Sequence, residues 1–488
     1  MTDPAMWDVA TLSAAFGSGS LSPVEVLSAV RARIAAFEPT INALVRHDAA
    51  TTAALDRESA LAAAQSEERW RRGESLGPLD GIPVTVKENL ARAGVAMQGG
   101  CAGATPVVPV RDSPVVERLR EAGAVIVGST TMPDWGMLSS GVSSLHGITR
   151  SPWDPALTTG GSSAGAGAAA VAAYGAIHVG TDIGGSIRLP GTWLGLVAHK
   201  PSFGRVPLDA PYLGRVAGPL TRTTADAAVA MSVLARPDDR DWTALPAHEA
   251  DWSVETASVR GLRVGLWLDA GAGMPCDPAV RAVAESAGRV FESGGAVVEE
   301  IQPWLTPQML ADIDLFWRVR SLADLETLTP ENRSRVLPFV RRWAEGGART
   351  SGLDVLRAYQ SVMAMRAATV AATAAYDLIV SPVAPVAAFP AEWPMPWGEA
   401  DEGMAHIGFT VPFSMSGQPA CSVNAGFLDD GRTVGVQVAG RRFDDVGVLR
   451  AVGWFEGVRG LTATPRWPAQ DAPQDWVASN RPQVADDC

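Results

Sequence analysis

Residues 158–190, TTGGSSAGAGAAAVAAYGAIHVGTDIGGSIRLP, contain the strongest structural signal in the chain. Two serine turns flanked by glycines, Gly160-Gly161-Ser162-Ser163 and Gly184-Gly185-Ser186, enclose an Ala-rich segment without proline. Glycine permits positive φ and lets a second backbone or a ligand come close. A turn that presents several free N–H groups beside a hydroxyl can bind a developing oxyanion. The two turns are therefore the candidate reactive centre, and the remaining sequence is expected to form its scaffold.

The composition is that of an acidic globular protein. The 488 residues are enough for one large domain or several modest ones, and 47% hydrophobic against 19% charged residues excludes a disordered chain. A net charge of −13 argues against nucleic acid or an anionic membrane surface as the main partner. The four cysteines are far apart in the sequence, so neither a metal site nor a disulfide framework is indicated.

The sequence shows no targeting segment. The first residues, MTDPAMWDVA, lack a basic n-region and an apolar h-region. The longest weakly apolar run is the Ala-rich segment, which Tyr174 and His178 interrupt, so a buried helix is favoured there over a membrane span. We expect a cytoplasmic protein, monomeric or homodimeric, that acts on a small-molecule substrate without nucleic acid or membrane.

Alternating helical and extended patterns predict an α/β fold. Ser22-Pro23-Val24-Glu25 is a helix start, and residues 48–71 are expected to form a second helix. Further helices are expected at 113–122, from 224, at 277–292 and at 444–458, and strands at 84–89, 124–128, 195–201, 261–267, 296–299, 377–382, 420–426 and 434–440. The predicted organisation is a helical flank at 1–75, an α/β domain at 76–468 with a helical insertion at 305–375 that is a possible lid, and a tail at 469–488.

Two general motifs can be read in the glycine-rich stretch. Gly161-Ser162-Ser163-Ala164-Gly165 matches GxSxG and would make Ser163 a nucleophile, but that motif requires a strand directly before it. Residues 153–159, WDPALTT, contain a proline and turn formers instead. A dinucleotide-binding loop requires a third glycine and a preceding strand, and Gly165-Ala166-Gly167 has neither.

A third interpretation joins Lys87 to the two serine turns, and here the sequence resembles the amidase signature family of Ser–Ser–Lys hydrolases over most of its length. The matching segments are GIPVTVKEN at 81–89, SPWDP at 151–155, GGSS at 160–163, GTDIGGSIRLP at 180–190, FTVPF at 409–413 and GQPA at 417–420. The spacing of the segments agrees as well. The resemblance implies an α/β/α sandwich around a large mixed sheet, with helical additions.

The resemblance also implies roles for single residues. Ser186 matches the nucleophile, Lys87 matches the base, and Ser162 matches the bridging serine, whose preceding peptide bond is cis in the family. One departure is that Ala164 and Ala166 stand where the family commonly has glycine and serine. Neither change removes a member of the triad.

The loop before the nucleophile matches the family's oxyanion hole. The backbone N–H groups of Ile183, Gly184 and Gly185, together with that of Ser186, are implied as its donors. Asp182 and Arg188 match the residues that support this loop, so they are expected to be structural partners.

The chemistry of lysine agrees with the implied role of Lys87. A lysine with a pKa of ~10.4 is already protonated at neutral pH and is a poor base. Burial lowers that pKa by up to ~3–5 units. Val84 and Val86 place Lys87 at the end of an apolar strand, where such burial is expected. A neutral amine there can take a proton from Ser162, while Ser162 takes one from Ser186.

Apolar and aromatic residues are expected to wall the substrate pocket. The predicted substrate-binding residues are Met132, Trp135, Gly136, Met137 and Trp193, with Leu138, Tyr212, Leu213, Trp317 and residues 382–408 completing the wall. Such a wall favours small, mostly uncharged aryl or alkyl amides, anilides or carbamates, and esters as a further substrate class. No metal or organic cofactor is implied.

Two other functions remain open from the sequence. The family includes the A subunit of the glutamine-dependent tRNA amidotransferase, a role that requires partner subunits and a surface for charged tRNA. The net charge of −13 and the lack of a basic stripe count against it. A binding protein on a catalytically dead scaffold is disfavoured by the intact Lys87, Ser162 and Ser186.

Overall fold

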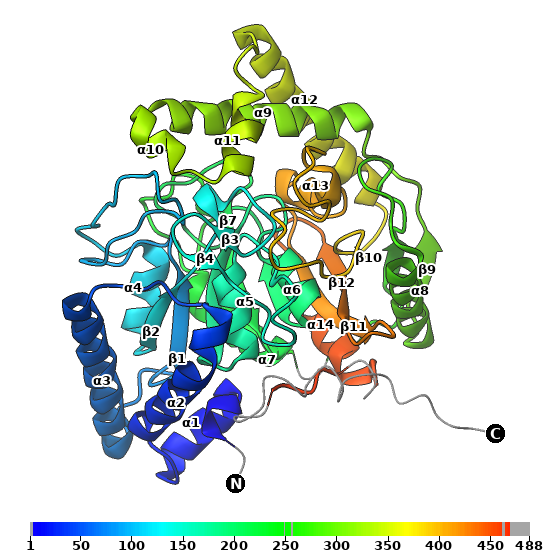
Figure 1. Cartoon of the computed structure of the whole chain (residues 1–488). Coiled ribbons are helices and arrows are strands. Elements are labelled where there is room, and N and C mark those ends of the chain that lie inside the picture. Colours follow the sequence, from blue (N-terminus) through cyan, green and yellow to red (C-terminus); the bar gives the residue numbers. More distant parts are fainter. Residues whose placement is uncertain (1–2, 248, 255–256, 461–463, 469–488) are drawn as a thin grey trace.

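A mixed sheet of ten strands forms the centre of the molecule (Figure 1). The computed structural model describes residues 3–247, 249–254, 257–460 and 464–468. The strand order is β2-β1-β5-β7-β6-β11-β12-β10-β8-β9. The strands are β1 (Pro83–Lys87), β2 (Val125–Thr130), β5 (Ile177–Asp182), β6 (Val197–Lys200), β7 (Val216–Thr221), β8 (Arg263–Leu266), β9 (Val297–Glu300), β10 (Leu378–Pro382), β11 (Ala420–Phe427) and β12 (Thr433–Gly440). Two short strands, β3 (Val142–Ser143) and β4 (Gly147–Ile148), pair separately.

The sheet is parallel at its two edges and antiparallel in its middle. At one edge β1 is parallel to both β2 and β5, and at the other β8 is parallel to β9 and β10. The pairs β5·β7, β6·β7, β6·β11, β11·β12 and β10·β12 are antiparallel. Because β1 and β5 run in parallel, their carboxyl ends, with Lys87 and Asp182, lie at the same border of the sheet.

Helices cover both faces of the sheet and one of its ends. They are α1 (Val9–Ser18), α2 (Pro23–Ile41), α3 (Ala49–Arg72), α4 (Pro114–Glu121), α5 (Ala164–Val171), α6 (Arg188–Leu194), α7 (Thr224–Leu234), α8 (Pro278–Ser293), α9 (Pro307–Glu326), α10 (Pro330–Ser334), α11 (Pro338–Glu345), α12 (Gly352–Thr373), α13 (Val411–Met415) and α14 (Asp445–Val458). The largest core cluster joins α7, α8 and α14 to one face, and α5 and α6 pack on the other. This three-layer arrangement confirms the predicted α/β/α sandwich.

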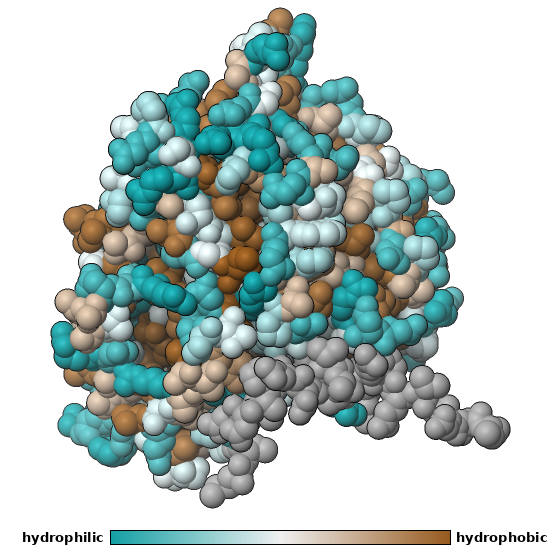
Figure 2. Space-filling model, viewed as in Figure 1, coloured by the Kyte–Doolittle hydropathy of each residue, from teal (hydrophilic) through white to brown (hydrophobic). Residues whose placement is uncertain are grey.

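Helices α9 to α12 form a cap at one end of the sheet (Figure 1). They occupy most of residues 305–375. On the face drawn in Figure 2, apolar residues gather in a band below this cap, between hydrophilic flanks. No helix in the described part of the chain is long and apolar enough to cross a membrane.

Small residues allow α5 to lie close to the rest of the core. A Cβ atom on Gly165 would come within 2.2 Å of the Ala43 carbonyl oxygen, and one on Gly167 would come within 2.6 Å of Leu194 Cδ1. All eight residues of α5 are buried. The alanines and glycines of this segment therefore fix the position of the Ser162 turn against the strands.

Two central strands, β5 and β7, are absent from the sequence-based prediction. Residues 164–182 are buried throughout, so they show neither the helical nor the strand period that partial burial produces. β7 contains Pro219, which normally argues against an inner strand. It is accommodated because β6 pairs only with Leu220 and Thr221, so the ladder on that side does not reach Pro219.

The predicted domain boundaries stay a prediction. Helices α1 and α2 contribute to the same core cluster as β1, through residues such as Leu12 and Val30 beside Val84. The predicted tail at 469–488 lies outside the described residues.

Candidate active site

A cavity of about 490 Å³ lies where the carboxyl ends of β1 and β5 face α9. Both Ser162 and Ser186 line it, although they belong to turns at opposite ends of the Ala-rich segment. Helix α5 carries the chain away from Ser162, and β5 returns it to Ser186. The fold therefore brings the two predicted serine turns to one cavity.

Lys87 reaches Ser162 from the last position of β1. Its side chain is fully buried, and its Nζ atom lies 2.8 Å from Ser162 Oγ and 3.1 Å from Ser163 Oγ. The Gly161–Ser162 peptide bond is cis, as the resemblance implied. The predicted lysine and bridging serine are thus in direct hydrogen-bond contact.

The surroundings of Lys87 favour its neutral form. Burial lowers the pKa of Lys87 well below its ordinary value, and the positive charge of Arg215 lowers it further. The nearby carboxylates of Asp182 and Glu88 act in the opposite direction but are outweighed. An uncharged amine can accept a proton from a hydroxyl, so the position suits a base.

A buried ion pair shapes the loop that carries Ser186. The Asp182 carboxylate accepts hydrogen bonds from the N–H groups of Gly185 (2.8 Å) and Ile187 (3.1 Å) and from the Arg188 guanidinium (2.9 and 3.0 Å). Burial alone would raise the pKa of Asp182, but Arg188 outweighs it and lowers that pKa to about 2. Gly185 has φ +132°, a conformation that other residues rarely adopt.

The predicted oxyanion donors differ in whether their N–H groups already make a hydrogen bond. The N–H of Gly185 is occupied by Asp182, at 2.8 Å. Within the described part of the chain, the N–H groups of Ile183 and Gly184 donate no hydrogen bond, and both residues line the cavity. These two groups are therefore available to an oxygen atom held beside Ser186.

Four of the five predicted substrate-binding residues line this cavity, namely Met132, Trp135, Gly136 and Met137. Trp193 does not. Its indole N–H donates to the Val386 carbonyl at 2.9 Å, and its ring packs edge-on against Phe389 and lines a neighbouring cavity. Trp193 lies on α6, close after Ser186 in the sequence, but its side chain lines the neighbouring cavity.

The two general motifs find no support in the geometry. Ser163 is fully buried, donates to the Thr181 carbonyl at 3.1 Å, and is not part of the cavity wall. No strand leads into it. Gly165 and Gly167 lie inside α5, where neighbouring atoms leave no space for a nucleotide.

Two arginines in the cavity wall were missed by sequence reasoning. Arg215 lies just before β7, and Arg320 lies on α9. An arginine at the entry to a strand is usually solvated, so Arg215 gave no signal by itself. The pairing of Asp182 with Val216, between β5 and β7, brings Arg215 beside the loop that carries Ser186.

Comparisons with known proteins agree with this site. A family model described as Amidase matches residues 25–449. An acylamidase of Rhodococcus erythropolis is 34% identical over 468 residues, which cover 93% of this chain and 96% of the relative. The A subunit of the glutamyl-tRNA(Gln) amidotransferase from Myxococcus xanthus is also 34% identical, over 91% of this chain and 96% of the relative.

A solved structure supports the same assignment. A bacterial aryl acylamidase of the amidase signature family superimposes with a TM-score of 0.83 and 27% identity, covering 92% of this chain and 96% of the other. The chain belongs to the amidase family and has the amidase signature fold. It is an amide hydrolase.

Proposed function

We propose that the chain cleaves carbonyl–nitrogen bonds through an acyl-enzyme on Ser186, with Ser162 as relay and Lys87 as base. The observation that carries the proposal is the 2.8 Å contact between the buried Lys87 Nζ and Ser162 Oγ, in a cavity that also holds Ser186. A buried amine next to a hydroxyl pair has no evident structural purpose that a neutral residue would not serve better.

The proposed reaction has two halves. Ser186 Oγ attacks the carbonyl carbon, its proton passes to Ser162, and the proton of Ser162 passes to Lys87. The N–H groups of Ile183 and Gly184 stabilise the oxyanion. Lys87, through Ser162, then protonates the leaving nitrogen, and the carbon–nitrogen bond breaks. Water attacks the acyl-enzyme by the reverse path, which releases the acid and restores Ser186.

We infer that the substrate has an aryl or alkyl body. Met132, Trp135, Met137, Trp317 and Ile407 supply apolar surface to the cavity, which is large enough for a small aromatic amide. Amides, anilides and carbamates share the reacting carbonyl–nitrogen bond, and esters would react by the same steps. The expectation of mostly uncharged substrates is not retained, because Arg215 and Arg320 belong to the same wall.

A fluorophosphonate probe tests the mechanism directly. We expect a single adduct, which peptide mapping assigns to Ser186 and which is absent in Ser186→Ala. In Lys87→Ala the labelling rate should fall by about 10²-fold or more, because general base catalysis contributes that much. The same wild-type protein should release aniline from acetanilide. An adduct on Ser163, or an unchanged rate in Lys87→Ala, would refute the proposed roles.

A role in a multi-subunit amidotransferase is the second candidate function. It is favoured by the 34% identity to the amidotransferase protein of Myxococcus xanthus over 91% of this chain. That role predicts that partner subunits co-purify with the protein and that the isolated chain does not hydrolyse acetanilide or other stand-alone amides. Hydrolysis by the isolated chain that depends on Ser186 would exclude it as the main activity.

A cytoplasmic location and a monomeric or homodimeric state remain predictions, as does a small molecule as the only partner.

A further inference from the structure

Arg215 lies in the wall of the cavity, and its guanidinium has no ionic partner among the residues that the structure describes. Arg215 is half-buried and lines the cavity with Ser162 and Ser186. Its backbone N–H donates to the Tyr212 carbonyl, but its side chain makes no hydrogen bond or ion pair with any residue that the structure describes. A partly desolvated guanidinium with five unused donors is costly unless something satisfies it.

A second guanidinium, that of Arg320, lies in the same wall. It stacks over the Tyr212 ring, 5.2 Å from its centroid, and Nη1 lies 3.8 Å from Met137 Sδ. The two positive charges repel each other. Burial lowers the pKa of Arg215, and the charge of Arg320 lowers it further. Two cations therefore lie in the wall of one cavity, in a protein whose net charge is −13.

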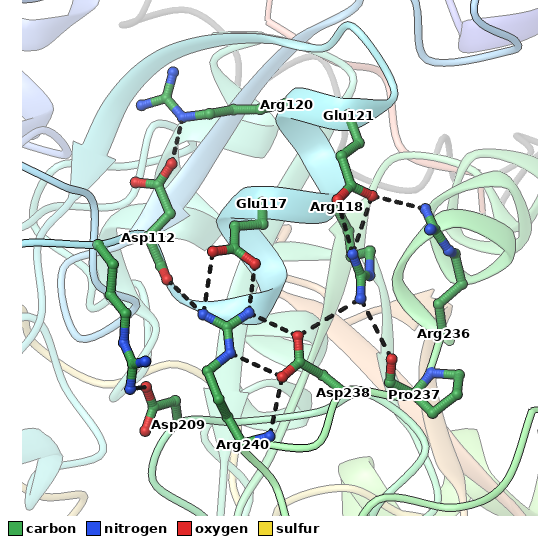
Figure 3. Close-up of polar contacts among 11 residues, drawn as sticks. Asp112, Glu117, Arg118, Arg120, Glu121, Asp209, Arg236, Pro237, Asp238 and Arg240 are labelled. Carbon is green, nitrogen blue, oxygen red and sulfur yellow. Dashed lines mark hydrogen bonds and ion pairs between the residues drawn. The ribbon is translucent and has the colours of Figure 1, made fainter.

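Nearby carboxylates do not neutralise this pair. Asp209 also lines the cavity, but its carboxylate is paired with Arg111 at 3.0 Å (Figure 3). Asp324 lies 3.8 Å from Arg320 in a partly exposed contact, which is long for an ion pair. Of the charged residues that line the cavity, Arg215 has no counter-ion within the described part of the chain and Arg320 has only a distant one.

We propose that Arg215 and Arg320 bind a carboxylate of the substrate, so that the preferred substrates are amides with an apolar or aromatic body and an anionic end. This inference rests on the proposed amide hydrolysis at Ser186 and adds the substrate class. The planar guanidinium matches a planar carboxylate and can donate two parallel hydrogen bonds to it. Met137 and Tyr212 pack against Arg320, which leaves its position largely set before a substrate binds.

Matched pairs of anilides test this inference. One pair places the charge on the amine side, 4-acetamidobenzoate against 4-acetamidobenzamide. The other pair places it on the acyl side, succinanilate against its terminal amide. We expect the carboxylate of at least one pair to have a higher kcat/KM, by about 10- to 100-fold, the range for a charge-assisted hydrogen bond. The pair that shows the preference identifies which side of the scissile bond faces the arginines.

Variants assign the preference to the two side chains. Arg215→Met should abolish it, mainly through a higher KM for the carboxylate, while Arg320→Gln should reduce it. Arg215→Lys should keep part of it, because the charge remains. Arg357→Gln is the matched control, since Arg357 is an exposed arginine of the same cap, outside the cavity.

The outcomes separate this inference from the proposed function. If neither pair shows a preference, or if Arg215→Met lowers both members of each pair equally, the carboxylate site is wrong. In that case Ser186-dependent hydrolysis of the neutral members would still support the proposed function. If the wild type hydrolyses no member and fluorophosphonate does not label Ser186, the proposed function itself fails, and the carboxylate inference fails with it.

Discussion

The charge of Arg215 acts on the amine of Lys87. Because Arg215 lowers the pKa of Lys87, it favours the neutral amine that the proposed reaction requires. Activity should therefore fall as the pH decreases through the pKa of Lys87. Removing the charge in Arg215→Met raises that pKa, so the acidic limb of kcat/KM should move to higher pH.

The measurement is a pH profile of kcat/KM on neutral acetanilide, for the wild type and Arg215→Met. A neutral substrate separates this effect from any carboxylate binding. An acidic limb that stays in place would mean that Arg215 does not act on the base.

The two adjacent serines should respond differently to substitution. Ser162→Ala removes the hydroxyl that contacts Lys87 at 2.8 Å, and kcat/KM should fall by ~10²–10⁴-fold, as expected for loss of a proton relay. Ser163→Ala removes only supporting hydrogen bonds, to Lys87 and Thr181, so its loss should be about tenfold or less. Equal losses in two folded variants would contradict the assignment of Ser162 as the relay.

At the scale of elements, the loop that walls the cavity is tied to the helical cap through Asp134. Its carboxylate accepts hydrogen bonds from the N–H (2.8 Å) and Oγ (2.7 Å) of Ser144 and from the N–H of Leu337 (3.0 Å), just before α11. The loop that contains Met132 and Trp135 is therefore held in position partly by the helical cap.

Replacing Asp134 with alanine should weaken both the fold and substrate binding. The donors of Ser144 and Leu337 are partly buried, and each one left without a partner costs roughly 1 kcal/mol, so the midpoint of urea unfolding should fall. KM for acetanilide should rise, because Met132 and Trp135 lose their fixed position. Asp134→Asn keeps one accepting oxygen and should lose less stability. A wild-type KM in Asp134→Ala would show that the loop is held by other contacts.

At the scale of the whole molecule, Arg188 connects distant parts of the chain. Besides Asp182, it donates to the Thr410 carbonyl (2.9 Å), Ser414 Oγ (2.8 Å) and Gln437 Oε1 (2.6 Å). The loop that carries Ser186 is thereby joined to α13 and to β12, an inner strand of the sheet.

Arg188→Gln should destabilise the whole molecule by about 3–5 kcal/mol, because it leaves the Asp182 carboxylate buried without its cation. Tryptophan fluorescence and circular dichroism should report the same unfolding midpoint. In the wild type, the stability that the Asp182–Arg188 ion pair contributes is fully present above the ordinary Asp pKa of 3.8. It is lost as the pH falls toward the lowered pKa of Asp182, about 2. Arg432→Gln, which breaks a partly exposed pair with Asp430, is the control, with a loss of at most about 1 kcal/mol.

The sequence predicted single elements better than it predicted which elements lie next to each other in the fold. The strand that ends at Lys87 and the two serine turns were visible because strand periodicity and glycine turns are local signals. The position of β7 between β5 and β6 was not, since it depends on long-range pairing and includes Pro219. For the same reason Arg215 was missed. Trp193 was predicted for its aromatic character, which does not say which of two neighbouring cavities its ring lines.

The contact between Gly184 and Trp317 has an evolutionary consequence. A Cβ atom on Gly184 would come within 3.0 Å of Trp317 Cη2, so the loop that carries Ser186 meets the cap at a close point. Lys87 belongs to β1 and the two serine turns flank α5 and β5, whereas Trp317 and Arg320 belong to the helical cap between β9 and β10. Selection can reshape the cap and alter which molecules are accepted, while Lys87 and the serine turns stay in place.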